Sequence, residues 1–136
     1  LTAKAQYTYQ TAIDVTDPND SYYGDQIPYI PWHSGSAVGM FGWQNDWQQY
    51  GLNYSFIYVG ERYNQQENII YNYTQPWYTH DPSLVGEWDI HKAKGKRLFT
   101  LRAALDVNNL LSQDYDVILN YPMPKRNYKC TISITY

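Results

Sequence analysis

Glu87 and Asp89 have the spacing that most resembles a pair of catalytic acids. They lie two positions apart in a candidate strand, and alternate strand residues project from one face, which would place the two carboxylates roughly 7 Å apart. Two carboxylates at such a separation could act as the acid and the base of a glycosidase. Alternation along any strand produces such pairs routinely, so no catalytic residue is predicted.

Side chains that could bind a metal ion are also present. Oxygen ligands for Ca²⁺ in a loop are offered by Asp14, Asp17, Asn19, Asp20 and Asp25. This group lacks the spacing of an EF-hand loop, and its Asp-Pro-Asn-Asp run is explained by turn formation. The histidines His33, His80 and His91 are scattered and lack the spacing of a zinc site. We therefore predict no cofactor, and Ca²⁺ in an external loop is the alternative left open.

The elements that carry these residues are predicted to be β-strands, because side-chain polarity alternates with period two. The first alternating run covers residues 1–16, which exceeds the usual strand length of about 5–6 residues in soluble proteins. Further runs predict strands over 33–44, 50–60, 84–92, 96–108 and 127–136.

The connections between the predicted strands are alternately long and short. The long ones cover 17–32, 61–83 and 109–125, and the short ones cover 44–49 and a tight basic turn at 92–95. Such alternation predicts antiparallel strands that cross a slab, with long loops on one side and tight turns on the other. Bacterial outer-membrane barrels have this organisation.

The composition restricts the possible classes of protein. Aromatic residues make up 18% of the chain, with 16 Tyr and 5 Trp. Rings with a polar tip suit a boundary between a dry and a wet phase, and they are abundant in membrane barrels and in carbohydrate-binding modules. A net charge of −3 argues against a nucleic-acid surface. No run approaches the ~20 apolar residues of a membrane helix, and the single Cys130 excludes an internal disulfide framework.

Each predicted strand has one apolar and one polar face. On the last strand the apolar face, which we expect to contact lipid, carries Tyr128, Cys130, Ile132, Ile134 and Tyr136. The polar faces carry mainly Thr, Ser, Gln and Asn with single charges, which fits a hydrated or plugged lumen. A soluble β-sandwich with one wet face would show a similar pattern.

The predicted fold class is all-β, an antiparallel up-and-down transmembrane β-barrel segment of about six strands. Single-chain bacterial barrels have about 8 strands or more, and unpaired strand edges are not tolerated in hydrocarbon. We therefore expect more chain, or partner copies, to complete the barrel. The start at Leu1, already within a strand, is expected to reflect processing or fragmentation.

Four short motifs lie in order along the chain, at 23–33, 58–63, 107–115 and 121–126. Their characteristic residues are Gly24, Pro28, Pro31, His33, Gly60, Arg62, Asn108, Asn109, Leu110, Tyr115, Pro124 and Arg126. As a set they resemble the C-terminal barrel segment of TonB-dependent outer-membrane receptors. The Tyr-Pro-Met-Pro-x-Arg motif is most similar to receptors of the Bacteroides group, including cobalamin-receptor-like members. Lys125 departs from the family's usual glycine, which disfavours a positive φ there.

The resemblance implies a barrel of about 22 strands closed by a plug domain, located in the bacterial outer membrane. Residues 1–136 would supply its C-terminal part, and the plug and the TonB-contacting segment would lie outside this sequence. The implied function is energy-coupled uptake of cobalamin, an iron chelate or a glycan, without catalysis. The implied partners are the rest of the barrel and plug, the TonB complex, the barrel-assembly machinery and outer-membrane lipid. A surface lipoprotein lid is left open, and nucleic acid is not expected.

Two sets of residues are the candidate sites. The candidate ligand-binding residues of the external loops are Tyr71, Tyr73, Trp77, Tyr78 and Tyr115. They could stack on a ligand or a lid, or belt the outer leaflet. The lipid face and, by resemblance, the signal read by the assembly machinery comprise Tyr128, Ile132, Ile134 and Tyr136. Two alternative functions stay open, a soluble Tyr/Trp-rich carbohydrate-binding β-sandwich and a passive porin-like barrel.

Overall fold

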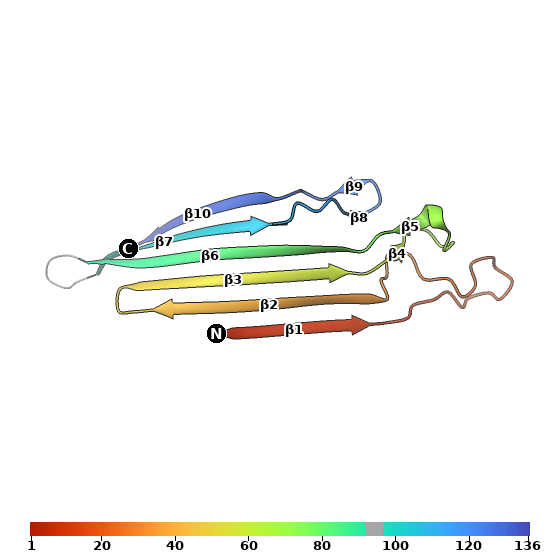
Figure 1. Cartoon of the computed structure of the whole chain (residues 1–136), viewed down its shortest axis with the longest axis horizontal. Coiled ribbons are helices and arrows are strands. Elements are labelled where there is room, and N and C mark those ends of the chain that lie inside the picture. Colours follow the sequence, from red (N-terminus) through yellow and green to blue (C-terminus); the bar gives the residue numbers. More distant parts are fainter. Residues whose placement is uncertain (92–96) are drawn as a thin grey trace.

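The computed structural model describes residues 1–91 and 97–136, and most of them lie in β-strands. Six long strands form one antiparallel sheet in the order β1-β2-β3-β6-β7-β10 (Figure 1). Their bounds are Thr2–Tyr9 (β1), His33–Gln44 (β2), Gln48–Val59 (β3), Trp77–His91 (β6), Arg97–Asn108 (β7) and Asn127–Thr135 (β10). Each long strand pairs with the next long strand along the chain, so the predicted up-and-down antiparallel fold is confirmed.

The short elements all lie at one end of the sheet, which we call the loop end (Figure 1). They are the pair β4 (Arg62–Tyr63) and β5 (Tyr73–Thr74), the 3₁₀ turn η1 (Ile70–Asn72), and the pair β8 (Asp116–Ile118) and β9 (Tyr121–Pro122). Both termini lie at the opposite end, the turn end.

At the turn end, β2 and β3 are joined by a connection in which Asn45 Oδ1 accepts from the backbone N–H groups of Trp47 (3.0 Å) and Gln48 (2.9 Å). This turn confirms the predicted short connection, although β3 begins two residues earlier than expected. The predicted turn at 92–95 lies outside the described residues.

The register places the apolar residues of neighbouring strands in rows across the sheet. Directly opposed residues of antiparallel strands project from the same face. One row contains Phe41, Leu52, Leu84, Leu105 and Cys130. The next row contains Trp43, Tyr50, Gly86, Ala103 and Ile132. The face that carries these rows is called the apolar face, and the opposite one the polar face.

Aromatic side chains gather at both ends of the apolar face. At the turn end, Trp43 stacks on Tyr50 with ring centroids 5.7 Å apart, and Trp88 donates from Nε1 to the Tyr50 hydroxyl at 3.0 Å. Toward the loop end the same face carries Tyr7, Tyr9, His33, Tyr54, Phe56, Tyr58, Tyr78 and His80. Rows of Leu, Ile, Ala and Gly lie between the two groups.

The polar face pairs opposite charges across neighbouring strands. Glu87 of β6 lies opposite Arg102 of β7, and Asp106 of β7 lies opposite Lys129 of β10. Ser83 donates from its hydroxyl to Asp106 at 2.5 Å. Such cross-strand pairs stabilise a sheet, and Glu87 takes part in one of them.

No hydrophobic residue among those described is buried. The reason is architectural, because a single sheet has no second layer against either face. A β-sandwich would enclose a core between two sheets, so the interpretation as a soluble sandwich is not favoured. Residues 1–91 and 97–136 also contain no helix that is long and apolar enough to cross a membrane.

The prediction of a strand over residues 1–16 was too long, because β1 ends at Tyr9. After Tyr9 the backbone forms irregular hydrogen bonds within the segment that leads to β2. The Gln10 N–H donates to Trp32 O at 3.0 Å, and the Gly24 N–H donates to Asp14 O at 2.7 Å. The partner strand β2 begins only at His33, so the regular ladder stops there. Asp14 then turns the chain by accepting from the Thr16 N–H at 2.8 Å.

The prediction of a loop over 61–83 was wrong at its end, because β6 begins at Trp77 and contains Pro82. Proline is tolerated where its missing N–H is not required by a neighbour. Pro82 lies opposite Tyr54 of β3, whereas pairing with β7 starts only at Ser83. The ladder between β6 and β7 therefore ends beside Pro82, and beyond it the Leu110 N–H donates to His80 O at 2.9 Å. The predicted loop 109–125 likewise contains the β8–β9 pair.

Candidate functional site

Three loops at the loop end contact one another and form one loop assembly, defined as residues 10–32, 60–76 and 109–126. The Tyr29 N–H donates to Tyr63 O at 2.8 Å, which joins the first loop to the second. Arg62 Nη2 donates to Asp116 O at 2.7 Å, which joins the second to the third. Polar contacts of this kind hold the assembly together.

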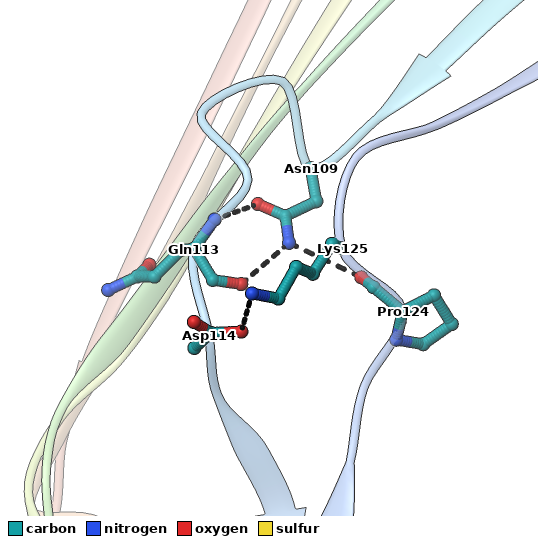
Figure 2. A network of polar contacts seen from close by, with 5 residues as sticks. All are labelled: Asn109, Gln113, Asp114, Pro124 and Lys125. Atoms are coloured by element: carbon teal, nitrogen blue, oxygen red, sulfur yellow. Dashed lines mark hydrogen bonds and ion pairs between the residues drawn. The ribbon is translucent and has the colours of Figure 1, made fainter.

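Asn109 is the centre of the third loop (Figure 2). Its Oδ1 accepts from the Gln113 N–H at 2.9 Å, and its Nδ2 donates to the carbonyls of Gln113 (2.8 Å) and Pro124 (3.3 Å). Its own N–H donates to Asp81 Oδ1 at 2.7 Å. The residue is 3% exposed and has a φ of 51°, a left-handed conformation that asparagine tolerates better than most residues.

Gly60 allows a close approach of two backbone segments just after β3. Its N–H donates to His33 O at 2.8 Å, and a Cβ at this position would lie 2.6 Å from the same oxygen. His33 is fixed in turn by Tyr7, whose hydroxyl lies 2.6 Å from His33 Nδ1. These contacts hold His33 in place at the start of β2.

Arg62 anchors the β8–β9 pair to the second loop. Its side chain is 3% exposed, and Nη2 donates to the carbonyls of Asp116 and Val117 at 2.7 and 3.3 Å. Burial is the main influence on the guanidinium and lowers its pKa, opposed by attraction from Tyr29 and Asp116. Arg126 makes a weaker contact, from Nη1 to Leu110 O at 3.4 Å.

The remaining motif residues occupy bends of the loops. Gly24 has a φ of 89°, which favours glycine, and Pro31 O accepts from Gln10 Nε2 at 3.4 Å. Lys125 is not among the positive-φ residues, in agreement with the expectation that its side chain disfavours such a conformation. It forms an exposed ion pair with Asp114 at 3.0 Å (Figure 2).

The structure brings together three of the five predicted ligand-binding aromatics. Tyr73, Trp77 and Tyr115 line one hollow of about 350 Å³. Trp77 and Tyr115 are stacked, with centroids 4.4 Å apart and planes at 25°. The pKa of the Tyr115 hydroxyl is raised by burial and secondarily by Asp81, and that of Tyr73 by burial and by its bond to Glu61.

Tyr71 and Tyr78 lie elsewhere. Tyr71 is on η1 and is 89% exposed. Tyr78 is on the apolar face, where its ring contacts Phe56 and His80 at centroid distances of 6.3 and 5.5 Å.

The last strand presents its predicted residues on the apolar face. Ile132 lies opposite Ala103 and Ile134 opposite Leu101. Tyr128 and Ile132 are both exposed, at 66% and 68%, and Tyr136 follows β10. The predicted face is thus formed, whereas its recognition by an assembly machinery stays a prediction.

The acidic side chains of the first loop serve its turns. Asp17 Oδ1 accepts from the Asn19 N–H at 2.9 Å, and Asp25 Oδ2 accepts from the Asn68 N–H at 3.0 Å. Hydrogen bonding to Thr16 lowers the pKa of Asp14. In the described part of the chain, no three His, Cys, Asp or Glu side chains are grouped so as to hold a metal ion.

Several polar residues of the site were not singled out from the sequence. They are the buried Gln26, Asn64 and Thr79, which are 4–5% exposed, and the half-buried Asp81 and Gln113 around Asn109. Asp81 lies in a segment predicted to be a loop. Only the Asn-Asn-Leu motif pointed to this region.

The comparison with protein families identifies the barrel. The family described as TonB dependent receptor-like, beta-barrel, matches residues 1–110, which is 110 of the 136 residues. No curated protein matches the chain. The matched residues run from β1 through β7 and include the motifs at 23–33 and 58–63. The chain therefore belongs to the TonB-dependent receptor-like β-barrel family, whose members are bacterial outer-membrane proteins of TonB-dependent transport.

Proposed function

We propose that residues 1–136 form the C-terminal part of the barrel of a receptor that imports a scarce ligand across the outer membrane. The apolar face contacts lipid, the polar face lines the lumen, and the loop assembly faces the cell exterior. The rest of the receptor supplies the remaining strands, the plug and the segment that contacts the TonB complex. The family match supports this proposal.

The proposal rests on the arrangement of side chains along β10 and the residue that follows it, Tyr136. Tyr128 and Tyr136 bound the apolar residues Cys130, Ile132 and Ile134 on one face. At a rise of about 3.4 Å per residue, the eight steps from Tyr128 to Tyr136 span about 27 Å along the strand. The apolar band of an outer-membrane barrel, flanked by aromatic girdles, is about 25 Å tall.

The ligand belongs to one of three classes, cobalamin, an iron chelate or a glycan. The receptor is of the Bacteroides type. Tyr73, Trp77 and Tyr115 are the candidate contacts, because they share one hollow in the loop assembly. Tyr71 is free to contact a lipoprotein lid, since it is the most exposed of the five. Tyr78 belongs to the aromatic belt.

Uptake in cells tests the function. A strain that lacks the intact receptor is compared with wild type for uptake of labelled cyanocobalamin, ferric chelates and oligosaccharides. Loss of one uptake activity is expected, with restoration by a plasmid copy and equal loss in a TonB-deficient strain. Recovery of the receptor outside the outer-membrane fraction, or uptake of all three classes without it, would contradict the proposal.

A further inference from the structure

A second hollow, of about 420 Å³, lies where the loop assembly meets the polar face. Val59 and Trp77 contribute to it as opposed residues at the end of the β3–β6 ladder. The other lining residues come from all three loops and are Tyr29, Arg62, Val117 and Ile118. Its walls are therefore apolar except for one guanidinium, one indole N–H and one phenol.

Two buried donors in this lining have no acceptor among the described residues, Arg62 Nη1 and Trp77 Nε1. Nη2 of Arg62 is bonded to two backbone carbonyls, so the guanidinium is held firmly while the N–H groups of Nη1 remain unmet. Unmet buried donors are unfavourable and are rare in native proteins. Two of them around one hollow indicate an acceptor that binds there.

The chemistry of that acceptor follows from the donors. Arg62 is 97% buried, given its exposure of 3%, and none of the described carboxylates forms an ion pair with it. A buried guanidinium that is attracted by Asp116 but forms no ion pair with a described carboxylate still favours an anion. A guanidinium matches a planar acceptor with two oxygen atoms. Water could bond to both donors, but it carries no charge to balance the guanidinium.

We propose that this hollow is a subsite for a carboxylate group of the imported ligand. The carboxylate oxygens accept from Arg62 Nη1 and Trp77 Nε1, and the adjoining apolar part of the ligand packs against Val59, Val117 and Ile118. The inference deepens the proposed function and rests on it, since it names the chemistry of one part of the imported molecule.

Benzoate is the probe, because it combines a carboxylate with a flat apolar group. Its binding to the intact receptor in detergent is measured by isothermal titration. Benzamide keeps the shape without the charge, and acetate keeps the charge without the ring. Loss of a charge-assisted bond predicts binding of benzamide about tenfold weaker than that of benzoate. Acetate is expected to be weaker as well, because it leaves the apolar walls uncovered.

Two variants test the donors, and a third is their control. Trp77→Phe removes the indole N–H, keeps a ring beside Tyr115 and is expected to weaken benzoate binding about fivefold. Arg62→Lys keeps the charge but loses the planar fork, with an expected loss of about tenfold or more. Trp43→Phe makes the same change on the apolar face and is expected to leave binding unaltered. Arg62→Lys also disturbs the β8–β9 anchor, whereas Trp77→Phe leaves that anchor intact.

Equal binding of benzoate to the Trp77→Phe and Trp43→Phe variants would overturn the subsite, as would equal binding of benzoate and benzamide or no binding at all. A carboxylate from another part of the receptor seated on Arg62 would also overturn it. The uptake experiment separates the two proposals. Benzoate binding in a receptor without TonB-dependent uptake contradicts the function alone, and uptake without benzoate binding contradicts the subsite alone.

Discussion

The sheet and the loop assembly are built in opposite ways. Among the described residues of the six long strands, only Thr79 and Gly86 are buried. The loop assembly, which is irregular and lies at the periphery, buries Gln26, Gly60, Arg62, Asn64 and Asn109. The interior of this molecule is therefore found in its loops rather than in its sheet.

The difference shows where each part obtains its stability. The sheet is held by backbone ladders, and its two faces differ in polarity, as expected for lipid on one side and a wet lumen on the other. Long loops are usually mobile, but here a few buried side chains bond to backbone groups and fix them. A change in the sheet should thus depend on which face it alters, and a change in a loop on whether the residue is buried.

The largest effect is expected from a charge on the apolar face. Ile132→Lys places an ammonium in lipid and is expected to destabilise the barrel of the intact receptor by about 2–4 kcal/mol. Thr131→Lys is the matched control on the polar face, opposite Ala104, and is expected to have a small effect. Urea unfolding in lipid vesicles measures both. Equal losses would mean that the two faces are wrongly assigned.

The next largest effect is expected at Asn109. Asn109→Ala removes three side-chain hydrogen bonds and leaves buried partners unmet, which costs about 1–3 kcal/mol. Asn108→Ala is the control, because that side chain makes one exposed bond, to Asn127 at 2.9 Å. Hydrogen exchange of residues 109–126 in the intact receptor should accelerate strongly only in Asn109→Ala. Similar acceleration in both variants would refute the role of burial.

Gly60 tests the close approach between the second loop and the start of β2. Gly60→Ala puts a Cβ 2.6 Å from the His33 carbonyl, and such overpacking costs about 1–3 kcal/mol. Gly39→Ala, in the middle of β2, meets no atom within 4 Å and should be neutral. Thermal unfolding of the intact receptor compares the two. If Gly39→Ala lowered the thermal stability as much as Gly60→Ala, the effect would come from strand propensity and not from the contact with His33.

The same contrast explains what the sequence could predict. The strands and their faces followed from period two, since alternation depends only on local geometry. Pro82 was misassigned because a proline usually breaks a strand, and only the register reveals that the ladder with β7 ends just beside it. The end of β1 was missed for a similar reason. Alternation continues to Thr16, but the partner strand β2 begins at His33, opposite Tyr9, so nothing pairs regularly with the residues after Tyr9.

The candidate site could be predicted only in part. The motif residues Asn109 and Arg62 were identified by resemblance, but their partners Asp81, Gln113 and Asp116 were not. Those partners are brought together by loop conformation, which no periodic pattern encodes. The hollow around Arg62 combines residues from all three loops with a strand residue that had been assigned to a loop, so it could not be foreseen.

The smallest effect is expected at Lys125, which lies beside Asn109 in the same loop (Figure 2). Its ion pair with Asp114 joins side chains that are 65% and 76% exposed, and exposed pairs contribute about 0–1 kcal/mol. Lys125→Ala should therefore leave hydrogen exchange of the loop nearly unchanged, and added salt should remove any residual difference. Because Asn109 and Lys125 both contact the segment 113–114, they differ mainly in burial. A large effect at Lys125 would show that charge, and not burial, fixes this loop.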